Sequence, residues 1–212
     1  MVIDEIIGKW RKRLIDISWF MRGINEYIAR KANKEDKCKG RFWEGCFKSQ
    51  ALLDEEALLT YMAYVDLNPI RAKMADSIES SEYTSGYERI QCNLSAASLI
   101  EGDLNLPTLF GFVGDMYQQN PDGLTYSLID YIELLDWTGR VIRPDKRGSI
   151  SANHPLLLHS LGIDEDSWIE LASSFGQNYQ GSVGSLEELA LFAAHTGKCW
   201  IASKNALRRC LH

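Results

Sequence analysis

Apolar residues at helical spacing constrain the fold of this chain more than any other feature of its sequence. After Asp16, a good helix N-cap residue, an apolar stripe follows at i, i+3, i+4, i+7, i+10 and i+11, made of Ile17, Phe20, Met21, Ile24, Tyr27 and Ile28. Two later stripes consist of Leu128, Tyr131, Ile132 and Leu135, and of Trp168, Leu171, Ala172 and Phe175. With only five prolines in 212 residues, the pattern predicts a mainly α-helical protein.

Three further helices are expected from local signals. One covers about 3–14, and another runs from near Asp54 to about Asp66 with Leu58, Met62 and Val65 as its core face. Asn68 and Pro69 end that helix, because the residue before a proline disfavours helical backbone, and we expect Asn68 to cap a short following helix. The spacing of Ser185 and Glu188 is that of a capping box and predicts a helix over the following residues.

Two segments lack helical spacing. Residues 41–50 (RFWEGCFKSQ) combine aromatic and basic side chains and are expected to form a short strand or an extended loop. Residues 76–107 begin with a polar run rich in serine and glutamate, which is typical of a domain boundary followed by a connector. No internal repeat is present in the sequence.

Composition excludes several classes of protein. The chain is 45% hydrophobic and 25% charged, which argues against disorder, and no apolar run reaches the roughly 18–20 residues of a membrane helix. The N-terminus lacks the apolar core of a signal peptide. The five cysteines include no CxxC pair, which argues against a disulfide framework or a zinc site. We therefore expect a cytoplasmic protein that has no membrane partner.

Charge is distributed unevenly along the chain. Its formal net charge is −6, yet residues 9–48 carry 12 Lys and Arg against 5 Asp and Glu, a local charge of +7. Residues 76–212 carry 9 against 18. Because attraction to phosphate is local and screened within about 10 Å, the basic stretch indicates either contact with nucleic acid or simply a solvated helix face.

Most catalytic patterns are missing from the sequence, which has no HExxH, no Walker loop, no GxSxG and no pair of histidines at ligand spacing. The remaining candidates are Tyr61, Tyr64 and Asn68, which share one helical face. Tyr64 and Asn68 are four residues apart, close enough for a phenol and an amide oxygen to serve one site. Two interpretations stay open: a reactive tyrosine, or two tyrosines at the edge of the core beside a helix cap.

The aromatic-basic run at 41–48 also has two interpretations. Phe42, Trp43 and Phe47 are either core residues of a strand with Arg41 and Lys48 at its rim, or a stacking platform for single-stranded DNA in a basic groove.

The order of these segments resembles a known family. Arg41-Phe42-Trp43-Glu44-Gly45, then residues 47–50 (FKSQ), then residues 64–72 (YVDLNPIRA) are similar to the C-terminal part of the catalytic domain of single-tyrosine HUH transposases, particularly those associated with REP elements and bacterial insertion sequences. Residues 123–148 resemble the C-terminal extension of the longer bacterial members, so the resemblance covers nearly the whole chain.

The resemblance implies a chemistry for these residues. In that family a tyrosine attacks a phosphodiester of single-stranded DNA and forms a 5′-phosphotyrosyl intermediate, with Mg²⁺ or Mn²⁺ held by a His-hydrophobic-His strand and by a polar residue four positions after the tyrosine. Carried over by position, Tyr64 is the catalytic nucleophile and Asn68 a metal ligand, with Tyr61 as the competing nucleophile. Arg41, Trp43, Lys48, Arg71 and Lys73 are the expected DNA-binding residues.

One departure from the family limits this assignment. None of the 212 residues forms a His-hydrophobic-His motif. We therefore expect residues 1–75 to be the late part of an α+β HUH catalytic domain, with helices and at most a short strand or two. Residues 76–107 are then a connector, and 108–212 an all-α C-terminal extension. On this interpretation the chain binds no metal ion and performs no strand transfer.

Three functional hypotheses follow. The first is a transposase of mobile elements that acts on single-stranded DNA and is truncated and inactive as given. The second is a non-catalytic remnant that binds single-stranded or hairpin DNA, and the third is an acidic helical interaction module formed by residues 108–212. The sequence does not decide between a monomer and a homodimer.

Overall fold

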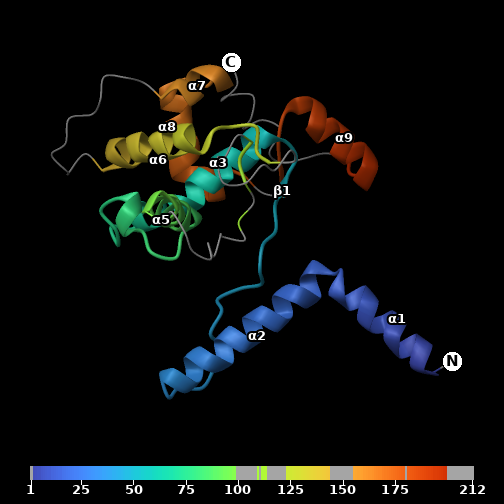
Figure 1. The fold of residues 1–212 in the computed structure, drawn as a ribbon. Helices are drawn as coiled ribbons and strands as arrows, with labels where there is room; N and C mark the ends of the chain where they lie inside the picture. Colours follow the sequence, from blue (N-terminus) through green and yellow to red (C-terminus); the bar gives the residue numbers. More distant parts are fainter. Residues whose placement is uncertain are drawn as a thin grey trace. The chain divides into compact units, whose positions relative to one another are not determined.

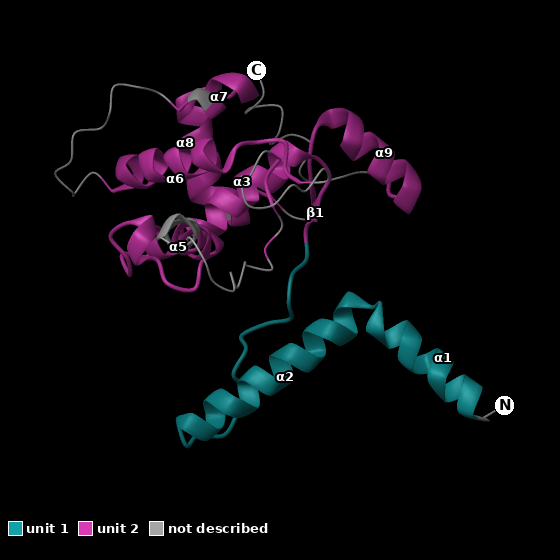
Figure 2. Cartoon of the chain, in the orientation of Figure 1, with its two compact units in different colours: residues 1–49 teal, residues 50–212 magenta. Residues whose placement is uncertain are grey.

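The structure is a computed structural model that describes residues 2–98, 109, 111–113, 123–143, 155–179 and 181–199. It is mainly helical, as predicted. The chain divides into two compact units, residues 1–49 and residues 50–212 (Figure 2). The sequence predicts divisions after residues 75 and 107, whereas in the structure residues 50–98 belong to the same unit as the C-terminal helices.

The first unit is a pair of helices followed by a loop. Helix α1 spans Val2–Leu14 and α2 spans Ile17–Glu35, as the periodicity predicts. The carboxylate of Asp16 caps α2 by accepting hydrogen bonds from the backbone N–H groups of Ser18 (2.8 Å) and Trp19 (3.3 Å). The loop then turns back along α2, because Nε1 of Trp43 donates to the carbonyl of Asn25 at 2.9 Å.

This first unit has no core of its own in the part that the structure describes. Across residues 3–49 every side chain is exposed or half-buried, and the predicted stripe of α2 is largely in contact with solvent. Phe20 is 60% exposed and Ile17 is 57% exposed. Residues 41–49 contain neither helix nor strand, so the aromatic-basic run is a loop.

The second unit is built around three long helices. Helices α3 (Glu55–Asp66), α6 (Leu128–Ile142) and α8 (Glu165–Asn178) lie together in Figure 1, and α8 contacts both of the others. The other elements of this unit are α4 (Asn68–Arg71), the 3-10 turn η1 (Ile78–Ser80), α5 (Ser85–Ser98), α7 (Leu156–Leu161) and α9 (Leu186–Thr196).

A short sheet joins the start of this unit to the segment between α8 and α9. Strand β1 (Ala51–Leu52) pairs in parallel with β2 (Ser182–Val183). A single bridge also links Phe112 to Leu124. The side chain of Gln50 donates to the carbonyl of Tyr179, so residues 50–53 are fixed against the segment that follows α8.

Two apolar clusters stabilise the second unit. The larger one includes fully buried residues of α3, α6 and α8, such as Leu59, Leu134 and Trp168. The smaller one joins the start of α3 to α8, β2 and α9 and consists of Ala57, Leu171, Phe175, Tyr179, Val183 and Leu189. The predicted stripes of α6 and α8 are confirmed, since Tyr131, Leu135, Trp168 and Ala172 are fully buried.

Two predictions about α3 and α4 are wrong in detail. Val65 is 43% exposed and does not belong to the core face, because α3 instead buries Leu59 and Ala63 between its neighbours. Asn68 is the first residue of α4 rather than its cap, and the N-cap position of α4 is occupied by Leu67, which makes no side-chain hydrogen bond. Because Asn68 does not cap α4, its side-chain amide can bind another residue.

Part of the predicted connector is ordered secondary structure. Ser77, Ser80, Ser81 and Thr84 bind nearby backbone groups through their hydroxyls, and α5 begins directly afterwards at Ser85. In the described ranges no helix is both long enough and apolar enough to cross a membrane.

Candidate functional site

The structure brings three of the predicted site residues together at the end of α3. Tyr64 lies in the last turns of α3, whereas Asn68 and Arg71 begin and end the short helix α4. Only Leu67 separates the two helices, so the backbone continues almost as one helix and keeps the three side chains on adjacent turns. Lys73, the fourth predicted residue of this region, is exposed in the turn that follows, with a φ of 59°.

Helix α8 covers the tyrosine face of α3. The ring of Tyr64 lies 6.0 Å from that of Phe175, and Tyr61 lies 5.5 Å from the same ring in an edge-on arrangement. The Tyr64 hydroxyl lies against Gly176, where an added Cβ would be only 2.7 Å from its oxygen. Within the described residues this hydroxyl has no hydrogen-bond partner that could take its proton. Tyr64 therefore lies half-buried at the edge of the core.

Arg71 connects Tyr64 and Asn68 to α8. Its guanidinium carbon lies 3.9 Å from the centroid of the Tyr64 ring, a cation–π contact. One terminal nitrogen donates to the Ser173 carbonyl of α8 at 2.6 Å, and the other donates to Oδ1 of Asn68 at 2.9 Å. The buried Nε of the same side chain has no acceptor among the residues that the structure describes. Arg71 thus holds the Tyr64 ring and the Asn68 amide of the predicted site in position.

These contacts do not suit a divalent metal ion at Asn68. The amide oxygen that would bind the metal already accepts a hydrogen bond from Arg71, and a guanidinium at 2.9 Å would repel a second cation. Among the described residues no group of three or more His, Cys, Asp and Glu side chains could hold a metal. The arrangement does not fit Mg²⁺ or Mn²⁺.

A buried polar cluster on another side of α3 was missed by sequence reasoning. Asp66 is fully buried and accepts hydrogen bonds from the hydroxyls of Tyr131 (2.7 Å) and Ser85 (2.8 Å). Burial, and then the Asp66 carboxylate, raise the pKa of Tyr131 well above its ordinary value, while the Arg89 charge acts in the opposite direction. Three elements, α3, α5 and α6, are joined at this point. The cluster is enclosed, which indicates a structural role.

The remaining predicted DNA-binding residues lie in the first unit. Arg41, Trp43 and Lys48 are all exposed in the loop after α2. Trp43 contacts Phe42 edge-on, with ring centroids 4.8 Å apart, and remains 38% exposed. These side chains are therefore accessible surface rather than strand core. They belong to the first unit, whereas Tyr64 belongs to the second unit.

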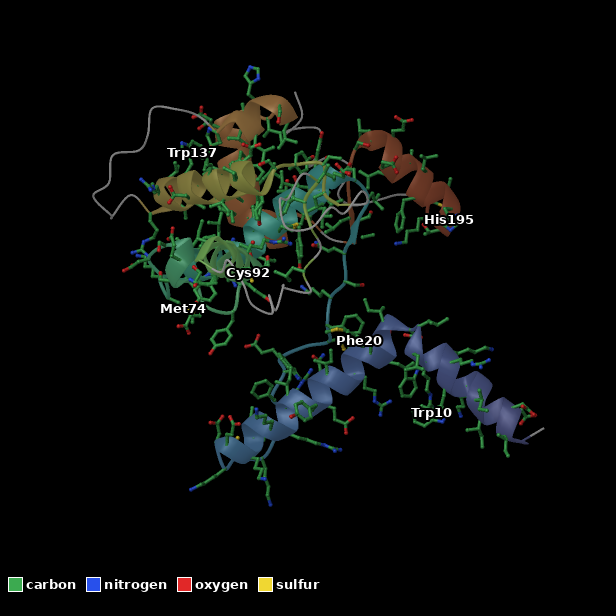
Figure 3. The ribbon with its side chains drawn as sticks, viewed as in Figure 1. Trp10, Phe20, Met74, Cys92, Trp137 and His195 are labelled. Carbon is green, nitrogen blue, oxygen red and sulfur yellow. The ribbon has the colours of Figure 1, made fainter. Side chains whose placement is uncertain are left out.

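More aromatic side chains are exposed on α1 and α2 than the predicted site includes. Trp10, Trp19 and Phe20 are 60%, 39% and 60% exposed, and Figure 3 shows Trp10 and Phe20 projecting from their helices. Arginines lie against two of these rings: Arg13 contacts Trp10 and Trp19, and Arg22 contacts Trp19. In the sequence, the sign of this surface was that Trp10 and Trp19 lie within a basic stretch. Helical spacing alone does not distinguish such exposed aromatic residues from those of a core stripe.

Comparison of the chain with known proteins gives no family assignment. No protein-family model matches it, and neither a curated protein nor a solved structure does.

Proposed function

We propose that this chain binds single-stranded or hairpin DNA through its first unit and carries out no strand transfer of its own. The observation that carries the proposal is the surface of residues 3–49, which combines aromatic rings with cationic side chains, none of them buried. Nucleic-acid-binding surfaces for single strands combine positive charge along the backbone with aromatic rings that stack on unpaired bases.

Charge supports this assignment over a purely structural role. The segment 9–48 carries 12 basic against 5 acidic residues, although the whole chain is acidic. One of its carboxylates, Asp16, is engaged in capping α2, and another, Glu26, pairs with Arg30. An excess of positive charge therefore remains on exposed side chains, and phosphate groups are its natural partners.

The environment of Tyr64 supports the absence of chemistry. Its hydroxyl faces α8, its ring lies under the Arg71 guanidinium, and Asn68 is engaged by that same guanidinium. The resemblance to single-tyrosine HUH transposases supports the choice of single-stranded DNA as the ligand. We infer that the transposase-like residues 64–72 now contribute to folding.

A binding and cleavage experiment tests both halves of the proposal. A fluorescein-labelled hairpin with a single-stranded flank is titrated with the full chain at increasing salt, and log K is expected to fall linearly with log salt concentration by about 0.7 for each phosphate contact. Tyr64→Phe should bind equally well. Incubation with Mn²⁺ should give no protein–DNA adduct in denaturing gels.

Two outcomes would contradict the proposal. Absence of salt-dependent binding would favour the acidic interaction module of the C-terminal helices. A covalent adduct that disappears in Tyr64→Phe would make the chain an active transposase.

A further inference from the structure

Two arginines from different helices converge on one indole ring at the junction of α1 and α2. The Arg13 guanidinium carbon lies 4.1 Å from the Trp19 ring centroid, and that of Arg22 lies 5.1 Å from the same centroid. Arg13 also approaches Trp10 at 5.7 Å. We call Arg13, Trp19 and Arg22 the arginine bracket.

No carboxylate neutralises the bracket in the part of the chain that the structure describes. Arg22 and Glu26 are four residues apart on α2, a spacing that favours an ion pair, yet Glu26 binds Arg30 instead. Asp16, the nearest acidic residue in the sequence, uses its Oδ1 for the N–H groups of Ser18 and Trp19. Two like charges are thus held close to one ring, which costs electrostatic free energy that a bound anion would offset.

The chemistry of the bracket favours phosphodiester groups. A guanidinium presents a planar fork of donors that matches phosphate oxygens, and contact with an aromatic face preorganises that fork. The basic last turn of α1, with Arg11 and Lys12, adds positive charge next to Arg13. The exposed rings of Trp10 and Phe20 provide surfaces for unpaired bases, which a duplex does not offer.

We propose that the arginine bracket is the principal phosphate-binding site of this chain for single-stranded nucleic acid. The inference rests on the proposed function and locates it at residues outside the loop 41–48 and outside the Tyr64 region. Arg13 and Arg22 bind the phosphates of one strand while Trp19 holds both guanidinium groups in position.

The test compares two double variants of the full chain that remove the same charge. Arg13→Gln with Arg22→Gln removes the bracket, whereas Arg30→Gln with Lys31→Gln removes two cations elsewhere on α2, one of them already paired with Glu26. Affinity for a labelled oligothymidine is measured by anisotropy over a salt series. We expect the bracket variant to lose about tenfold in affinity and about 1.4 from the salt slope, and the control to lose clearly less.

A third variant separates binding from folding. Arg13→Lys with Arg22→Lys keeps both charges and should retain most of the salt slope, and far-ultraviolet circular dichroism shows whether α1 and α2 persist in each variant. Equal losses in the bracket variant and its control would overturn the bracket while leaving the proposed function in place. Failure of the unmodified chain to bind the oligonucleotide at low salt would overturn both. Tighter binding to phosphatidylserine vesicles than to the oligonucleotide would assign the surface to lipid and overturn the inference.

Discussion

The guanidinium of Arg71 lies over the ring of Tyr64, with its central carbon 3.9 Å from the ring centroid. The same group donates to Asn68 and to the Ser173 carbonyl, so one side chain joins α3, α4 and α8. The residues that resemble a catalytic tyrosine and its metal ligand are therefore held in a contact that stabilises the second unit.

Arg71→Lys should destabilise the second unit although it preserves the charge. A lysine ammonium cannot reach both acceptors and cover the Tyr64 ring at the same time, because it lacks the planar fork. We expect the free energy of unfolding to fall by about 1.5–3 kcal/mol, the range for lost hydrogen bonds to a charged group. Urea denaturation followed by tryptophan fluorescence measures the change, since Trp137 and Trp168 lie in this unit.

Arg140→Lys provides the matched control for this substitution. Arg140 also bonds to a neighbour, Asp136, but both side chains are about half exposed, and such surface pairs contribute little. An effect of Arg140→Lys as large as that of Arg71→Lys would show that the Arg71 contacts carry no special stability.

Gly176→Ala should fail to give the stabilisation that alanine normally brings to a helix. Alanine is favoured over glycine in a helix interior by about 0.8–1.0 kcal/mol. At this position, however, the new Cβ would lie 2.7 Å from the Tyr64 hydroxyl oxygen and 3.2 Å from its ring carbon Cζ. An overpacking cost of about 2 kcal/mol, the middle of the usual range, less about 1 kcal/mol gained from helix propensity, leaves an expected net loss of about 1 kcal/mol.

A double-mutant cycle with Tyr64→Phe checks the cause of that loss. Removal of the hydroxyl relieves the closest approach, so Gly176→Ala should be less harmful in the Tyr64→Phe background by about 0.5–1.5 kcal/mol. Gly23→Ala on α2, where nothing lies within 4 Å, should instead increase helicity. Additive effects of Gly176→Ala and Tyr64→Phe would mean that the hydroxyl does not lie against α8.

Patterns within a few neighbouring residues predicted much of this fold. Contacts between residues far apart in the sequence could not be predicted from them. Asp16 and Ser185 cap helices as expected, because a cap depends on residues within one turn, and α3 begins directly after Asp54, near where the sequence predicts it to start. The hydrogen bond from Arg71 to Ser173 joins residues 102 positions apart, and nothing in the spacing of either indicates the other. The sequence could place Tyr64 and Asn68 on one helical face, but only the packing of α8 shows what covers that face.

Asp54→Ala should destabilise the second unit more than the loss of an ordinary helix cap. The carboxylate accepts from the Ala57 N–H at 2.8 Å at the start of α3 and also from the Ser185 N–H at the start of α9. Loss of the cap costs about 0.5–2 kcal/mol, and the second unpaired donor adds to it, so we expect about 2–4 kcal/mol in total. Asp54→Asn keeps one acceptor oxygen and should cost about half as much in the same urea experiment. Equal losses in the two variants would contradict a double role for this carboxylate.

Tyr131→Phe should remove part of the alkaline sensitivity of the second unit. The pKa of Tyr131 is raised in the folded state by burial and by the Asp66 carboxylate, so the neutral phenol favours folding. Its contribution is fully present below the unfolded pKa of about 10 and is lost as pH rises toward the folded pKa, by about 1.4 kcal/mol per pH unit.

At neutral pH the variant should be less stable by about 1–3 kcal/mol, because Asp66 loses a buried donor. Above pH of about 10, its stability should fall less steeply than that of the unmodified chain. An unchanged alkaline slope in Tyr131→Phe would show that this phenol does not couple folding to pH.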